Sequence, residues 1–201
     1  MLTSVLEAEW YRYIPEWRFH KNGRIRPLFR FSATQNSCVC NVHTHHVYWR
    51  LDFDVDGALH NAVDEFNLPP LQDDNYWLPL TYETKRFHEP SCTRWWRVKN
   101  INTSDAWEII PGDNDGTADA YGKGDFWVLR YREDRVQAEF DDGYNFTTGG
   151  MATSADIDRF VNGERVDDAD VVVWYAAHFR HDLRSGGSHV VGPVLQPADA
   201  R

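Results

Sequence analysis

The sequence has few cysteines, no excess of basic residues and no long apolar run, and each absence narrows its class. Three cysteines among 201 residues are too few, and odd in number, for a scaffold held by disulfides. A net charge of −10 argues against a nucleic-acid partner, which would require a basic face. No stretch approaches the roughly 18 apolar residues of a membrane-spanning helix, so we expect no membrane partner.

The first nine residues, from Met1 to Glu9, lack the basic start and the long apolar core of a signal peptide. On that ground we expect a cytoplasmic location. The acidic balance suits small molecules, cations or further copies of the chain as partners, and it suits a merely solvated surface equally well.

Aromatic residues are plentiful, at 14% of the chain, and they favour β-strands. Short alternating or apolar runs are separated by turn signals such as Lys21-Asn22-Gly23. We therefore predict a mainly β protein, an antiparallel β-sandwich that forms a single domain over residues 1–201. Few short helices are expected, and Ala58 to Phe66 and Ser154 to Val161 are the candidates. The expected strands are Trp17–His20, Arg24–Phe31, Val47–Val55, Trp95–Val98, Ala106–Ile110, Phe126–Tyr131 and Val171–Ala177.

The chemistry-bearing residues concentrate in residues 38–57, which read CVCNVHTHHVYWRLDFDVDG. Side chains two apart on a strand share a face, so His43 and His45 can converge on one ion. Neutral imidazole is a good ligand for copper, zinc, iron and nickel. Two ligands alone are also compatible with a polar strand end.

Three separated segments together resemble the C-terminal part of the catalytic domain of copper amine oxidases. The first is Tyr11 to Ile25, in which a tyrosine precedes an aromatic strand and a turn. The second runs from His43 through Arg50-Leu51-Asp52-Phe53-Asp54-Val55-Asp56-Gly57. The third is Asp170 to Tyr175, followed by His181 and Arg184. The order and spacing of these segments are kept over roughly residues 10–185.

The resemblance implies a copper ion held by His43, His45 and His181, with His178 as an alternative third ligand. It also places Tyr11 where the family converts a tyrosine into topaquinone. The residues that flank Tyr11 depart from the family, since Trp10 replaces an asparagine and Arg12 an acid. An unmodified tyrosine is therefore the alternative.

Two further sites are expected on weaker patterns. The resemblance implies a calcium-type site, and oxygen ligands suit such hard cations. Its carboxylates are Asp52, Asp54 and Asp170. Near the histidines, Cys38 and Cys40 are candidate auxiliary copper ligands, because thiolates are soft donors; buried thiols or a disulfide with Cys92 are the alternatives.

The function that follows is a copper-dependent oxidoreductase that uses O₂, is amine oxidase-like and acts on a small-molecule substrate, an amine by resemblance. The family's catalytic aspartate lies far upstream of the quinone tyrosine, and no residue of this sequence corresponds to it. The alternative is a non-catalytic copper-binding protein, or a subunit of a larger hetero-oligomeric assembly. A truncated sandwich exposes strand edges, so we expect a homodimer or a partner chain that supplies the missing half.

Overall fold

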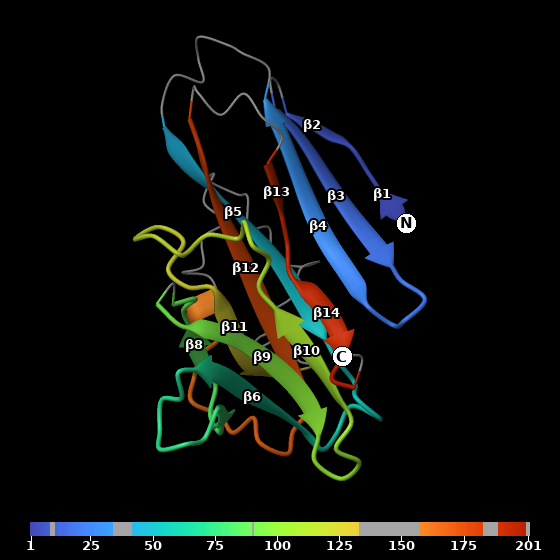
Figure 1. The fold of residues 1–201 in the computed structure, drawn as a ribbon, viewed down its shortest axis with the longest axis vertical. Helices are drawn as coiled ribbons and strands as arrows, with labels where there is room; N and C mark the ends of the chain where they lie inside the picture. Colours follow the sequence, from blue (N-terminus) through green and yellow to red (C-terminus); the bar gives the residue numbers. More distant parts are fainter. Residues whose placement is uncertain (9–10, 34–41, 90, 133–156, 183–188, 200–201) are drawn as a thin grey trace.

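A computed structural model describes residues 1–8, 11–33, 42–89, 91–132, 157–182 and 189–199, and these form a nearly all-β structure (Figure 1). Helical geometry within the described part is confined to residues 157–158, inside the second stretch predicted as helix. No helix there is long and apolar enough to cross a membrane. The strands are β1 Leu2–Thr3, β2 Leu6–Ala8, β3 Tyr11–Phe19, β4 Ile25–Ala33, β5 His43–Asp52, β6 Asn61–Leu68, β7 Trp77–Leu80, β8 Thr84–Arg86, β9 Thr93–Asn100, β10 Ala106–Ile110, β11 Phe126–Arg130, β12 Val171–His181, β13 His189–Val191 and β14 Val194–Pro197.

The strands pair into two antiparallel sheets. The large sheet follows the order β1-β3-β4-β14-β10-β9-β6-β7, with β2 beside β3 and β13 beside β4. The small sheet follows the order β5-β12-β11-β8. In Figure 1, β5 and β12 run side by side through the molecule. Residues far apart in sequence therefore become neighbours along one ladder.

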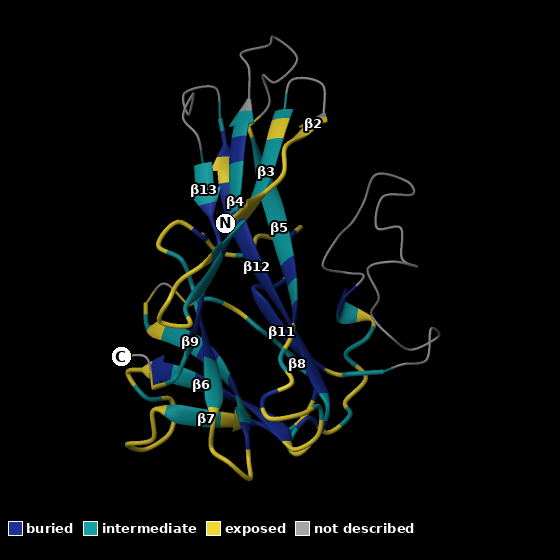
Figure 2. Cartoon of the chain, turned by 90° about the vertical axis from the view of Figure 1, so that its right-hand side faces the viewer, coloured by how far each residue is buried: buried dark blue, intermediate teal, exposed yellow. Residues whose placement is uncertain are grey.

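The main core lies between the two sheets, which confirms the predicted sandwich. Its buried residues come from both sheets, including Trp96 and Ile109 of the large sheet and Phe126 and Tyr175 of the small one. A second cluster covers the other face of the small sheet, around Trp174. A sheet buried on both faces reads as a continuous apolar run rather than an alternating one. This explains why nearly all of β12 is buried, as Figure 2 shows.

The predicted hairpin after Phe19 is present. The backbone N–H of His20 donates to the Arg24 carbonyl at 2.8 Å, and that of Gly23 donates to the His20 carbonyl at 3.1 Å. Gly23 adopts a φ of +83°, a conformation that costs glycine little. The hairpin joins β3 to β4 in a nine-pair register.

The prediction of a helix at Ala58 to Phe66 is wrong. Residues from Asn61 onward form β6, which lies between β7 and β9 and is buried on both faces. Its charged residues Asp64 and Glu65 obscured the strand pattern. Both are buried because they are paired: Asp64 with Arg97 at 2.7 Å, and Glu65 with the indole of Trp96 at 3.0 Å.

Candidate metal centre

The register between β5 and β12 decides which histidines meet. His43 stands opposite His181, and His45 stands opposite Phe179. Alternate residues share a face of a sheet, so His43, His45 and His181 all lie on the inner face of the small sheet. We call these three residues the histidine triad. His43 and His45 lie within β5 itself, whereas the strand was predicted to begin only at Val47.

The triad nitrogens converge on one point. One ring nitrogen from each histidine lies within 4.8 Å of the others, and the Nε2 atoms of His43 and His45 are 3.0 Å apart. His181 is 7% exposed, and its buried Nδ1 has no hydrogen-bond partner. A buried polar atom without a partner costs free energy. The arrangement therefore suits a cation that accepts the nitrogen lone pairs.

The surroundings keep His45 and His181 neutral. Burial, followed by the neighbouring histidines, lowers the pKa of His45 to about 3. The pKa of His181 is also lowered, by burial and then by His43. Neutral imidazole is the form that binds metal. At neutral pH each of these two rings therefore has one ring nitrogen with a free lone pair.

Tyr11 closes the triad from the opposite sheet. It is the first residue of β3, and its hydroxyl lies 3.3 Å from His43 Nε2. Its ring centroid is 5.5 Å from that of His45 and 6.0 Å from that of His181. Tyr11 and His181, which only the resemblance joined to His43 and His45, thus form one constellation with them between the sheets.

Two phenylalanines hold His45 in place, and neither was predicted from the sequence to be a site residue. The ring centroid of Phe31 lies 4.3 Å from that of His45. The Phe179 ring stacks on His45 with centroids 5.0 Å apart and an interplanar angle of 15°. Both are almost fully buried. Their signal was present only in the spacing, since Phe179 is two residues before His181 and so shares its face. They fix the ring and keep water from its sides.

The structure describes only some of the residues that flank Tyr11 and of the three cysteines. Arg12 points away from the triad and forms an exposed ion pair with Glu7 of β2 at 3.2 Å. Its charge is thus neutralised outside the constellation. Trp10, Cys38 and Cys40 lie outside the described residues, so their expected roles stay predictions. Cys92 is a free thiol.

His46 and His178 are separated from the triad. They stand opposite each other on β5 and β12, on the outer face of the small sheet. His178, the alternative third ligand, therefore faces away from His43 and His45. His189 lies nearer: it packs on Phe179 at 5.0 Å, and its ring is 6.5 Å from that of His181.

The predicted carboxylate group forms at the other end of the same strand pair. One oxygen each of Asp52, Asp54 and Asp170 lies within 4.8 Å of the others. Asp52 ends β5 and also accepts a hydrogen bond from Arg50 at 3.2 Å. The group is largely exposed, and such groups occur without an ion. A cation there stays a prediction.

A family model decides the relationship, because the model for the enzyme domain of copper amine oxidases matches residues 1–188. The chain belongs to the copper amine oxidase family. Copper fits the triad of this family member, since three imidazoles, one of them with an unpartnered buried nitrogen, form a suitable donor set. A search of curated protein sequences returned no match.

Solved structures show the same fold at low sequence identity. An amine oxidase from Aspergillus nidulans superposes with a TM-score of 0.74 at 16% identity, covering 99% of this chain and 34% of its own. A copper-containing benzylamine oxidase from Hansenula polymorpha gives 0.73 at 16% identity, with 99% and 39% covered. Pichia pastoris lysyl oxidase gives 0.69 at 13% identity, with 97% and 34% covered. The chain thus spans about a third of the length of these relatives.

Proposed function

We propose that this chain is the copper-binding part of an amine oxidase-like oxidoreductase that uses O₂, with copper held by His43, His45 and His181. The observation that carries the proposal is the convergence of three imidazoles beneath the Tyr11 hydroxyl. Copper bound there would supply one-electron chemistry with O₂. Two structural relatives are a copper-containing benzylamine oxidase and a lysyl oxidase, and their names support an amine as the substrate.

The protein groups around the site have distinct roles in this proposal. His181 offers its unpartnered Nδ1, and His43 and His45 offer Nε2. Phe31 and Phe179 orient the His45 ring and exclude water from its faces. Tyr11, hydrogen-bonded to His43, is the residue whose ring would be oxidised to the family's topaquinone.

The first experiment reconstitutes the metal-free chain with Cu(II) in air. We expect one Cu(II) per triad with nitrogen ligands, read by metal content and electron paramagnetic resonance. The peptide that carries Tyr11 is then weighed by mass spectrometry. A gain of two oxygen atoms with loss of two hydrogen atoms identifies the quinone, and Tyr11→Phe must abolish that change while keeping the copper signal.

Activity is measured as O₂ uptake with benzylamine as the probe, compared between wild type and Tyr11→Phe. Copper-dependent uptake lost in Tyr11→Phe supports the oxidoreductase. A chain that binds no copper with nitrogen ligands refutes the metal centre. Bound copper with an unmodified Tyr11 refutes the quinone and supports the second candidate.

That second candidate is a copper-binding domain without turnover of its own. It is favoured by Arg12, which stands where an acid is expected after the quinone tyrosine and which pairs with Glu7 on the surface. In this case the triad binds Cu(II), and O₂ uptake stays at the level of free copper.

We also propose that the chain self-associates as a homodimer, as an alternative to pairing with a different chain. Within the described part, β5 is one of the two terminal strands of the small sheet. Unpaired strand edges invite pairing. Light scattering after size-exclusion chromatography tests this: a mass of twice 23.4 kDa supports the homodimer, and a monomer contradicts it.

A further inference from the structure

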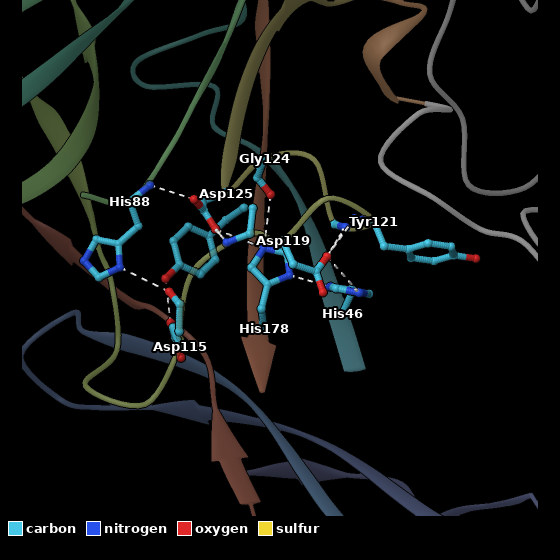
Figure 3. Close-up of polar contacts among 12 residues, drawn as sticks. His46, His88, Asp115, Asp119, Tyr121, Gly124, Asp125 and His178 are labelled. Atoms are coloured by element: carbon cyan, nitrogen blue, oxygen red, sulfur yellow. Dashed lines mark hydrogen bonds and ion pairs between the residues drawn. The ribbon is translucent and has the colours of Figure 1, made fainter. Parts of the chain in front are cut away.

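The outer face of the small sheet carries a second pair of histidines, which the proposed function does not use. His46 and His178, the histidine pair, are register partners on β5 and β12. Their Nδ1 atoms are 2.7 Å apart, and their rings lie 4.9 Å apart at 65°. Figure 3 shows the two rings next to each other, with Asp125 near His178 and Asp119 near His46.

The buried ring of the pair has a fixed tautomer. The His178 side chain is 1% exposed, and its Nε2 lies 3.1 Å from the Gly124 carbonyl oxygen and 3.0 Å from Asp125 Oδ1. A carbonyl oxygen only accepts hydrogen bonds, so Nε2 carries the hydrogen. The Nδ1 atom of neutral His178 therefore presents a lone pair to His46. Asp125 is held in turn by the backbone N–H groups of His88 and Ala118.

Without a cation, the neutral His46 ring has no hydrogen-bond donor to offer Asp119. Because His178 Nδ1 accepts, His46 Nδ1 must carry the hydrogen of the pair. The Nε2 atom of neutral His46 is then a lone pair that faces Asp119 Oδ1 at 3.8 Å. Asp119 is fixed in this orientation, since its Oδ1 accepts backbone hydrogen bonds from Tyr121 at 2.8 Å and Gly122 at 2.7 Å. Two acceptors thus face each other.

A cation between the two Nδ1 atoms removes this mismatch. Both rings then carry their hydrogen on Nε2, and each turns it toward a carboxylate, Asp125 for His178 and Asp119 for His46. This is the arrangement that metal-ligating histidines adopt, with the outer ring nitrogen bonded to a carboxylate or a carbonyl. Each of the two rings would thus direct Nδ1 toward the cation and its Nε2–H toward a carboxylate.

We propose that His46 and His178 bind one Cu(I) ion between their Nδ1 atoms. Two imidazole nitrogens on opposite sides of the ion suit Cu(I), which accepts two ligands in a line. Within the described residues no third side chain joins this pair to form a metal-ligand group. The site is distinct from the histidine triad, which lies on the other face of the same strands.

The pair must widen to accept the ion. Metal–imidazole bonds are about 2.0–2.1 Å long, so two opposed nitrogens stand about 4 Å apart, compared with 2.7 Å here. His46 is the ring that moves, because its side chain is 11% exposed against 1% for His178. It stacks on Tyr121, itself 47% exposed, with centroids 5.8 Å apart. Gly122 packs against the pair so closely that a Cβ would lie 2.7 Å from His46 Nδ1.

The test titrates the metal-free full chain with Cu(I) under argon against a colorimetric Cu(I) chelator. The triad is removed first, in the variant His43→Ala/His45→Ala/His181→Ala, so that remaining binding is not due to it. We expect this variant to bind one Cu(I), and the addition of His46→Gln to weaken that binding at least about 100-fold. His189→Gln is the matched control and should change nothing.

Nitrogen-15 NMR of the histidine rings provides the second readout, since Cu(I) is diamagnetic. In the wild-type chain, Cu(I) should shift the Nδ1 signals of His46 and His178 together. It should leave the hydrogen of His178 on Nε2 and move that of His46 from Nδ1 to Nε2. Shifts confined to the triad histidines, or chelator competition unchanged by His46→Gln, would overturn the proposal and leave the pair holding only a proton. If the triad variant does not fold, the wild-type NMR titration decides alone. Neither readout depends on oxidase activity, so this proposal and the proposed function fail separately.

Discussion

Replacing His181 with leucine should stabilise the metal-free chain and abolish its response to copper. The Nδ1 atom of His181 is buried without a partner, and leaving such an atom unsatisfied costs about 1–3 kcal/mol. Leucine removes that cost but also removes the edge contact with Phe31 at 5.1 Å, an aromatic contact of about 0.5–1.5 kcal/mol. The expected net gain in the free energy of unfolding is about 1 kcal/mol.

Copper should reverse the order of stability. At free Cu(II) a hundredfold above its dissociation constant, the wild-type chain gains about 2.7 kcal/mol, whereas His181→Leu gains nothing. Urea denaturation followed by far-ultraviolet circular dichroism, with a chelator and then with Cu(II), measures both effects. If His181→Leu is more stable than wild type with the chelator and less stable with Cu(II), His181 serves binding at the expense of stability.

The matched control is His189→Leu. The Nε2 atom of His189 is also buried without a partner, so the metal-free chain should gain stability in the same way. Because His189 lies outside the triad, its copper response should persist. A His181→Leu chain that keeps the copper response, or that loses more than about 1 kcal/mol without metal, would refute the assignment of His181.

Three further predictions follow from the described residues. Calcium at a hundredfold excess over its dissociation constant should raise the melting temperature by roughly 5–10 °C, and Asp54→Asn should abolish that rise in a thermal scan. Gly116→Ala should destabilise the chain far more than Gly163→Ala. Both glycines have positive φ, but only a Cβ at Gly116 meets a neighbour, the His178 carbonyl oxygen at 2.1 Å. Gly163→Ala should cost about 1–2 kcal/mol, and equal urea midpoints for the two variants would contradict this. Burial raises the pKa of Glu16, but Arg18 and Arg30 hold it on balance below its usual 4.5. The stabilisation from these ion pairs is therefore complete above pH 4.5 and is lost as the pH falls below it. Glu16→Gln should flatten the acid limb of a stability–pH profile, and an unchanged limb would contradict the ion pairs.

The fold class could be read from the sequence because turn signals and apolar runs are local. Ala106–Ile110 was predicted with the bounds that β10 has, since a short apolar strand between turns needs no tertiary information. β6 could not be predicted, because its buried Asp64 and Glu65 look like surface residues. Their burial depends on cations from other strands, such as Arg97 and Arg86.

The candidate site was predictable only in part. The spacing of His43 and His45 puts them on one face of any strand. His181 is 136 positions beyond His45, and composition and periodicity say nothing of its register; only the family resemblance brought it in. The role of His46 was missed, because its partner His178 becomes visible only once β5 and β12 are aligned.

One ladder therefore determines all three candidate cation sites. The apolar middle of β5, with Trp49 and Leu51, packs in the core against the β12 residues Val173 and Tyr175. A slip by one residue would turn every side chain of a strand to the other face. Such a slip would expose the core and, in the same step, dismantle the triad, the histidine pair and the aspartate group. The hydrophobic middle of the ladder is thus what positions the polar chemistry at its ends, and the free energy that fixes the core also fixes the sites.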